Sequence, residues 1–320
     1  MTEQIIKTKI MPVAQGIIDE VKKAVIGKDD IIIKSLLAII ARGHILLDDI
    51  PGVGKTTLAV AFSKAMSLDY KRMQFTPDVL PADVTGFTVY NKQTGSFEYK
   101  PGAALCSLFL ADEINRTSSK TQSALLEAME EGSVTVDGVT HTLPRPYTVI
   151  ATQNPIGSVG TQMLPESQLD RFIVRLTMGY PDLDSEIAIL KSKEGGVRSA
   201  EISSVASADD ILLMQNAADE IFVDDLVYKY IASIAAATRT HPQIKLGLSP
   251  RGTVALASMS KAAALLKGRS YVIPEDVKFI LSDVVAHRIL LSAKAKAAGV
   301  DTADVMRDIS ARTPAPKIRV

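Results

Sequence analysis

The chain is short of several things, and each shortage excludes a class of protein. It holds a single cysteine, Cys106, so it cannot form an internal disulfide, and the apolar run around Cys106 predicts a buried core position. Its formal net charge is +0, so no global basic field attracts nucleic acid. It also lacks a stripe of interleaved basic and aromatic residues, which argues further against a DNA-binding surface.

Long hydrophobic runs are missing as well. The richest stretch, Ile31–Ile40, is interrupted by Lys34 and is too short to cross a bilayer. Near the N-terminus Glu3, Lys7 and Lys9 have no apolar segment behind them, which is not the pattern of a secretory signal. We therefore expect a soluble, cytoplasmic protein with no membrane span.

What the chain does have is a hydrophobic content of 47% over 320 residues, which suits a large core and two domains. In residues 1–182, apolar strand candidates alternate with helical segments, and this alternation predicts an α/β fold with a parallel sheet covered on both faces. The strand candidates are His44–Leu47, Tyr70–Phe75, Ser107–Ala111, Thr148–Ala151 and Phe172–Met178. Two short hairpins are expected to stand off the sheet, at Thr88–Tyr90 with Ser96–Tyr99 and at Val134–Val136 with Val139–His141.

Residues 183–320 carry a different pattern, in which strand signals fade and helices dominate. Proline in the first turn and acids beside it mark two of the helix starts. The expected helices are Asp184–Lys193, Asp209–Ala218, Asp225–Thr238, Pro250–Lys267 and Pro274–Arg288. We predict a smaller all-α domain here, with the boundary between residues 182 and 183.

The most informative motif runs from Asp49 to Thr56, between a strand candidate and a helical segment, which is the context of a phosphate-binding loop. Gly52 and Gly54 let backbone N–H groups approach a phosphate. The helix N-terminus adds a positive dipole end. Lys55 can reach the β- and γ-phosphates, and the Thr56 hydroxyl can bind Mg²⁺.

Asp49 breaks the full spacing of this motif, which has glycine at that position. A carboxylate close to a triphosphate is unfavourable unless it points away or is paired. We therefore expect Asp49 to affect ATP affinity more than the fold.

An apolar strand candidate ends in two acids, Asp112 and Glu113. Asp112 is placed to hold Mg²⁺, and Glu113 to orient and deprotonate an attacking water. The alternative is that both acids cap the following turn, and the upstream phosphate-binding loop favours the catalytic interpretation.

Three further residues are weaker signals when each is taken alone. Asn154 ends another strand candidate and can bond the water or the γ-phosphate, although Asn-Pro is also a common turn. Arg171 precedes a strand and can stabilise charge on a transferring phosphoryl group, although surface arginines usually form ordinary ion pairs. Arg251 lies on a first helical turn and could fold back onto the triphosphate, or be an exposed cation.

In order and spacing, these motifs resemble an AAA+ ATPase of the MoxR family over roughly Val21 to Arg288. The specific runs are Asp112–Arg116 and Leu164–Phe172, and Val25–Gly27, Leu125–Met129, Ala151–Pro155 and Ser249–Arg251 support them.

The resemblance implies roles for these residues. It makes Lys55 and Thr56 the Walker A pair and Asp112 and Glu113 the Walker B pair. It makes Asn154 sensor 1, Arg171 an arginine finger supplied to a neighbouring subunit, and Arg251 sensor 2. The nucleotide-binding set it implies, which includes an adenine site at the first two residues, is Ile26, Gly27, Gly52, Val53, Gly54, Lys55, Thr56 and Thr57.

Proteins of this family are ring ATPases, usually hexameric, that use ATP and Mg²⁺. They are thought to act as chaperones in the assembly of protein complexes or metallocofactors, often beside a partner with a von Willebrand factor A domain. Two alternatives stay open: a related metal-chelatase or DNA-directed motor, and a scaffold that binds ATP and seldom hydrolyses it.

Overall fold

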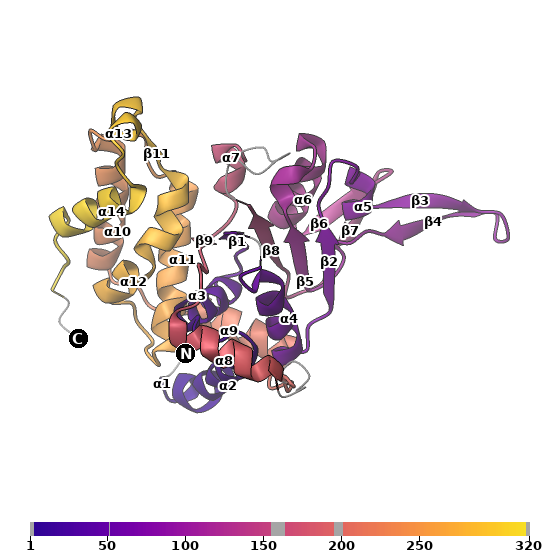
Figure 1. The fold of residues 1–320 in the computed structure, drawn as a ribbon, viewed down its shortest axis with the longest axis horizontal. Helices are drawn as coiled ribbons and strands as arrows, with labels where there is room; N and C mark the ends of the chain where they lie inside the picture. The colour runs from indigo at the N-terminus through magenta and orange to yellow at the C-terminus, as the bar shows by residue number, and fades with distance from the viewer. Residues whose placement is uncertain (1–2, 51, 155–163, 195–200, 318–320) are drawn as a thin grey trace.

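The computed structural model describes residues 3–50, 52–154, 164–194 and 201–317. Figure 1 shows a central sheet with helices around it, a hairpin that projects to one side, and a group of C-terminal helices on the other side. No helix in the described ranges is long and apolar enough to cross a bilayer.

Five strands within the described ranges form the central sheet, in the order β2-β5-β8-β1-β9, and every neighbouring pair is parallel. Each strand overlaps an apolar segment predicted from the sequence, so the predicted parallel sheet is confirmed. The strands are β1 (Ile45–Asp48), β2 (Tyr70–Gln74), β5 (Leu108–Asp112), β8 (Thr148–Gln153) and β9 (Val174–Leu176).

Alternate residues of the central strands enter two different cores, because successive side chains of a strand point to opposite faces. Ile45 and Leu110 join a core that includes α3 (Asp29–Ile40) and α4 (Lys55–Ala65). Leu46 and Phe109 join a core that includes α6 (Ser119–Glu131). The domain is therefore a three-layer α/β/α arrangement, as predicted.

The chain begins with helices. The helices α2 (Met11–Ala24) and α3 flank a break at Gly27, where φ is 72°. Before them, α1 (Glu3–Ile5) and a π-helical turn η1 (Ile6–Ile10) lead into α2.

Both predicted hairpins are present and stand off the sheet. The longer one pairs β3 (Gly86–Asn91) with β4 (Ser96–Pro101), follows α5 (Pro81–Thr85) and projects from the molecule (Figure 1). The shorter one pairs β6 (Ser133–Val136) with β7 (Val139–Thr142). The rings of Tyr99 and His141 stack at 3.7 Å and join the two hairpins.

The C-terminal part is mainly helical, as predicted, and also holds a small antiparallel strand pair that the sequence did not predict, because strands of two or three residues carry too few alternations to be recognised. The unpredicted elements are β10 (Ile244–Leu246), β11 (Leu290–Leu291), α13 (Ala293–Ala297) and α14 (Thr302–Arg312). The predicted helix Pro274–Arg288 ends in a 3₁₀ turn, η3 (Ala286–Arg288). The other elements after residue 113 are η2 (Ile114–Arg116), α7 (Glu166–Leu169), α8 (Leu183–Glu194), α9 (Ala208–Asp219), α10 (Asp225–Thr240), α11 (Pro250–Leu266) and α12 (Pro274–Val285).

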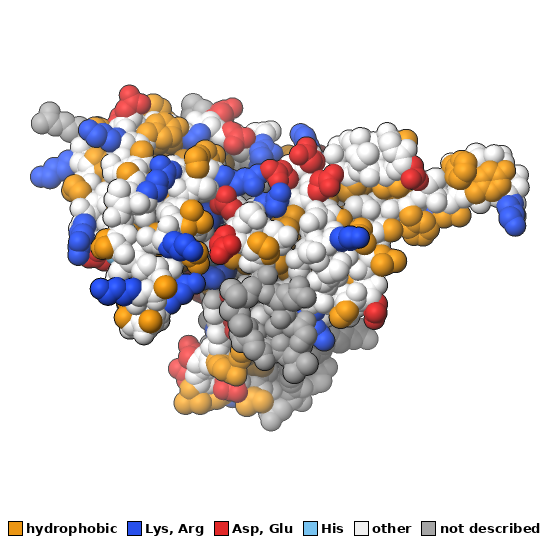
Figure 2. All heavy atoms as spheres, turned by 90° about the horizontal axis from the view of Figure 1, so that it is seen from above, with side chains coloured by type: hydrophobic (Ala, Val, Ile, Leu, Met, Phe, Trp, Pro, Cys, Tyr) orange, Lys and Arg blue, Asp and Glu red, His pale blue; other side chains and the backbone are white. Residues whose placement is uncertain are grey.

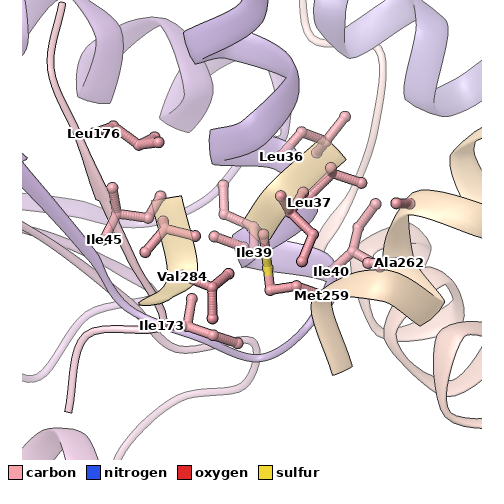
Figure 3. Close-up of a cluster of buried hydrophobic side chains, with 14 of the residues drawn as sticks. Leu36, Leu37, Ile39, Ile40, Ile45, Ile173, Leu176, Met259, Ala262 and Val284 are labelled. Carbon is pink, nitrogen blue, oxygen red and sulfur yellow. The ribbon is translucent and has the colours of Figure 1, made fainter. Parts of the chain in front are cut away.

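The helix α3 lies between the sheet and the C-terminal helices. Figure 3 shows Ile39 of α3 in one cluster with Met259 of α11 and with Val284 of α12, which lies on the same side of Ile39 as Ile45 and Ile173. All five side chains are buried and belong to a single hydrophobic cluster. The sheet domain and the C-terminal helices therefore share a continuous core through α3.

A buried histidine fixes the sheet to α6. His44 is within 3.0 Å of the carbonyl oxygen of Met129 through Nε2, and its Nδ1 accepts the N–H of Val149 at 3.0 Å. These partners require a neutral ring with the proton on Nε2. Burial lowers the pKa of His44 from its usual 6.5 to about 4.

We expect His44 to make the protein less stable in acid. The folded-state pKa lies below the unfolded value, so the unfolded chain binds the extra proton as pH falls from 6.5 towards 4, and stability falls with it. The loss is about 3 kcal/mol at the lower end. Urea unfolding of the parent and of His44→Gln between pH 7 and 4 checks this, since the variant has no ring to titrate. An equal pH slope in the two proteins would contradict it; His287, which is also buried with a lowered pKa, is common to both.

Candidate active site

A pocket of about 360 Å³ opens at the carboxyl ends of the parallel strands, where α/β sheets bind ligands. We call it the phosphate-loop pocket. It brings together residues of β2, the end of β5, the residue after β8, the loop before α4 and the start of α4. Its lining residues are Gly52, Gly54, Lys55, Thr56, Thr57, Arg72, Gln74, Asp112, Glu113 and Asn154.

The loop before α4 has the conformation that glycine permits. Gly52 and Gly54 have φ values of 88° and 98°, which residues with a Cβ rarely adopt. Lys55, the first residue of α4, is buried, and its Nζ donates to the carbonyl oxygen of Asp49 at 2.6 Å and lies 3.5 Å from Oδ1 of Asn154. Burial lowers the pKa of Lys55, and the negative charges of Asp49 and Asp112 oppose that shift.

The Asp49 carboxylate is buried and paired with backbone groups. Its Oδ1 accepts the N–H of Ile50 at 2.8 Å, and its Oδ2 accepts the N–H of Gly179 at 2.5 Å. Asp49 is not among the residues that line the phosphate-loop pocket. The residue that breaks the motif therefore joins the loop to the chain after β9.

Removing this carboxylate should destabilise the protein. We expect Asp49→Ala to lower the free energy of unfolding by about 2 kcal/mol, because two partly buried N–H groups lose a carboxylate acceptor. Asp48→Ala is the matched control, since its carboxylate makes only a 3.8 Å contact with Arg175 and should cost less than about 1 kcal/mol. Urea unfolding of the three proteins measures the difference, and equal losses would show that the Gly179 contact contributes nothing.

Both oxygens of Asp112 have partners. Oδ1 accepts the hydroxyl of Thr152 at 2.6 Å, and Oδ2 accepts Nη2 of Arg72 at 2.7 Å. The Thr152 hydroxyl in turn accepts the backbone N–H of Glu113 at 2.9 Å. One threonine thus fixes both acids at the end of β5.

Glu113 has a left-handed backbone conformation, with φ 57° and ψ 49°, at the turn after β5. Its side chain spans two partners. Oε1 accepts Nδ2 of Asn154 at 2.9 Å, and Oε2 accepts Nη1 of Arg116 at 2.7 Å. The acid and the asparagine predicted to act on the same water are therefore in direct contact.

Several residues that support the site were not singled out from the sequence. Asn115 brackets the backbone of Asn154, since its Nδ2 donates to the Asn154 oxygen at 3.2 Å and its Oδ1 accepts the Asn154 N–H at 3.4 Å. Thr152 and Arg116 stand inside runs quoted above, so their position was visible although their role was not. Arg72 had no signal beyond being a basic residue in an apolar strand.

The donor set fits Mg²⁺ held together with a nucleotide. Thr56 and Asp112 line the same pocket, and Mg²⁺ is usually bound by one or two protein oxygens plus phosphate oxygens. In the part of the chain that the structure describes, no three His, Cys, Asp or Glu side chains gather into a metal site. The residues therefore suit a metal that enters with phosphate ligands.

Arg171 and Arg251 are not in the phosphate-loop pocket. They meet at Glu130 of α6, whose Oε2 accepts Nε of Arg171 at 2.9 Å and whose Oε1 pairs with Nη2 of Arg251. Both arginines line a second pocket of about 260 Å³, which we call the arginine pocket; its other charged residues are Arg42, Glu130, Asp170 and Arg288. In this arrangement Arg251 does not line the phosphate-loop pocket, and its role toward a triphosphate stays a prediction.

Asp170 explains where Arg251 lies. Its Oδ2 accepts the hydroxyl of Ser249, the residue that caps α11, and its Oδ1 accepts Nε of Arg288 at 2.8 Å. The start of α11 is therefore attached to the segment that carries Arg171. This attachment sets Arg251 beside Arg171.

Ile26 and Gly27 also lie outside the phosphate-loop pocket. A Cβ on Gly27 would come within 2.0 Å of Oγ of Ser185 in α8, so the turn packs closely against that helix. The next residue, Lys28, donates to the carbonyl oxygen of Tyr180 at 2.9 Å. The adenine site assigned to Ile26 and Gly27 stays a prediction. Pro155, the last residue of the Ala151–Pro155 run, lies outside the described residues, as do residues 156–163, which precede the Leu164–Phe172 motif.

Comparison with family models identifies two regions of the chain. Residues 44–174 match the model described as "ATPase family associated with various cellular activities (AAA)". Residues 236–309 match the model described as "AAA lid domain".

The chain is also similar over nearly its whole length to known proteins. It is 46% identical to YeaC of Bacillus subtilis over 95% of each chain. It is 34% identical to the chaperone MoxR1 of Mycobacterium tuberculosis, over 93% of this chain and 81% of that protein. The crystal structure of a "putative ATPase" from Cytophaga hutchinsonii matches 97% of this chain and 98% of its own, with a TM-score of 0.90 and 36% identity.

Proposed function

Because this chain belongs to the MoxR family of AAA+ ATPases, we propose that it hydrolyses ATP and uses the turnover to remodel a protein partner. The observation that carries the proposal is the convergence of Lys55, Thr56, Asp112, Glu113 and Asn154 in one pocket.

The loop and the start of α4 bind the phosphates in this proposal. The glycine loop presents backbone N–H groups, and the N-terminus of α4 contributes its positive dipole end. Lys55 adds a positive charge, and its contacts with Asn154 and the Asp49 carbonyl oxygen orient its ammonium group. Thr56 and Asp112 would hold Mg²⁺. When bound, that ion neutralises charge on the phosphate oxygens.

Glu113 acts as the general base for the attacking water. Its carboxylate contacts Asn154, so the base and the residue that orients the water can address the same molecule. Thr152 holds the backbone of Glu113 in place, while Arg116 balances the carboxylate's charge.

The arginine pocket serves the site of a neighbouring subunit. Arg171 and Arg251 sit together outside their own phosphate-loop pocket, and their side chains are 30% and 46% exposed. An arginine supplied across an interface stabilises charge on the transferring phosphoryl group. We therefore assign both arginines a role in trans, within a ring that the family resemblance suggests is a hexamer.

The protein partner would bind the projecting hairpin. Figure 2 shows hydrophobic side chains gathered on it, and Phe87, Val89, Tyr90 and Phe97 are exposed by 39% to 74%. Exposed apolar groups of this kind mark interaction sites. A partner with a von Willebrand factor A domain is the first one to test. We further propose that residues 183–320 move relative to residues 1–182 as the nucleotide changes.

Turnover measured across protein concentration, with and without single-stranded DNA, tests the proposal. For a ring ATPase that acts on protein, ATP turnover per subunit should rise with the concentration of this protein and should be the same with and without single-stranded DNA. Stimulation by DNA would favour a DNA-directed motor. Tight ATP binding without turnover at any concentration would favour an ATP-gated scaffold.

A further inference from the structure

Asp112 lines the phosphate-loop pocket, and each of its two oxygens has a different kind of partner. Oδ1 belongs to the internal network, since the Thr152 hydroxyl that bonds it also holds the backbone of Glu113. Oδ2 is therefore the oxygen left for a metal, and Nη2 of Arg72 donates to it at 2.7 Å.

Arg72 reaches this oxygen from the neighbouring strand. In the parallel register Arg72 of β2 pairs with Leu110, and Gln74 pairs with Asp112. Arg72 and Gln74 lie on one face of β2, because alternate residues of a strand share a face. The Arg72 side chain is 47% exposed and lines the pocket, so it can leave Asp112 without opening a cavity in the core.

The contact with Arg72 and a bond to Mg²⁺ compete at Oδ2. Mg²⁺ binds oxygen at about 2.1 Å and withdraws electron density from it, so the same oxygen becomes a poorer acceptor for a guanidinium. The two cations would also repel each other. Asp112 is buried, so it needs one of them as a counter-charge.

We propose that Arg72 is a tethered cation that competes with Mg²⁺ for Asp112, so that it sets the metal concentration the nucleotide site requires. The inference rests on the proposed ATP function. Arg72 acts as a positioning residue in this proposal. It orients the Asp112 carboxylate and neutralises its charge while no metal is bound. Binding of the metal would displace the guanidinium from Asp112 into the pocket.

The test measures metal dependence without turnover. Binding of the fluorescent analogue mant-ADP is titrated with Mg²⁺ for the parent, Arg72→Gln and Lys71→Gln, and Mn²⁺ binding in the presence of ADP is followed by electron paramagnetic resonance. Arg72→Gln should reach half-maximal mant-ADP binding at an about three- to tenfold lower metal concentration. This is the scale expected when a half-exposed cation that forms a charged hydrogen bond with Asp112 is removed.

The control removes a positive charge from the preceding residue of the strand, Lys71. Lys71 donates instead to the carbonyl oxygen of Gly102, so Lys71→Gln should titrate like the parent. Arg72→Lys, which keeps a charge with a different donor geometry, should lie between the parent and Arg72→Gln, and it carries the test if Arg72→Gln does not fold.

Two results would overturn the inference: the same metal dependence in Arg72→Gln as in the parent, or a greater metal requirement, which would mean that Arg72 assists the metal. A parent that binds no mant-ADP at any Mg²⁺ concentration would instead refute the nucleotide function itself.

Discussion

Arg171→Ala should bind Mg-ATP like the parent and lose nearly all turnover, by about 10³–10⁵, the contribution of an arginine finger in well-studied systems. Arg171 is outside its own phosphate-loop pocket, so its removal leaves the binding residues intact. The fold should also tolerate the change, because Glu130 keeps Arg251 as a partner. Steady-state turnover and mant-ATP binding give the two measurements. Arg312→Ala is the control, since it removes another exposed arginine that pairs with a carboxylate.

Mixing two inactive variants decides whether Arg171 acts across an interface. Arg171→Ala subunits keep Glu113, and Glu113→Gln subunits keep Arg171, so some interfaces of a mixed ring hold both groups. About a quarter of the interfaces would be complete in randomly mixed rings of equal parts. Activity should return on mixing. If subunits exchange, as fluorescent labels can show, and no activity returns, Arg171 does not act in trans.

Glu113→Gln should bind Mg-ATP at least as tightly as the parent and turn it over about a hundredfold more slowly or worse, the usual scale for a lost general base. Glutamine keeps the size and an oxygen that can accept from Asn154, but it cannot take a proton from water. Single-turnover hydrolysis and mant-ATP binding separate chemistry from binding.

Two comparisons sharpen the Glu113 result. Lys55→Ala should weaken binding itself, because the role proposed for Lys55 is to contact the phosphates and not to act as the base. Glu127→Gln, on the exposed face of α6, should leave both quantities unchanged. If Glu113→Gln turned over ATP as fast as the parent, Glu113 would not be the general base.

The sheet and the edge that carries the candidate site could be predicted because their signals are local. Asp112 ends one apolar strand and Asn154 follows another, and the carboxyl ends of parallel strands meet on one edge, so these two residues had to come close together. Gly52 and Gly54 predicted a loop whose backbone N–H groups can approach a phosphate, and both residues have positive φ in the structure. The MoxR assignment followed from the same residues, and the comparisons confirm it.

The partners of charged side chains could not be predicted in this way. Arg72 is an ordinary strand residue until the register places it two residues before the neighbour of Asp112. The position of Arg251 depends on Ser249 bonding Asp170, which is 79 residues away in the chain. The same holds for Asp49, since the sequence showed an acid beside phosphates but could not show that Gly179 would take its carboxylate. Such contacts are decided by how distant elements pack.

If Arg171 and Arg251 act across a ring interface as proposed, the shared carboxylate of Glu130 has an energetic consequence for ring closure. An arginine that leaves Glu130 for a neighbour's phosphate exchanges one anionic partner for another, so the exchange adds little affinity between ground-state subunits. The balance changes only as the phosphoryl group accumulates charge during transfer, when the phosphate becomes the stronger acceptor. With Glu130 as the competing partner, both arginines would bind the neighbour's phosphate more strongly only in the transition state. Interactions that strengthen only in the transition state raise the rate of the chemical step and leave the occupancy of the site unchanged.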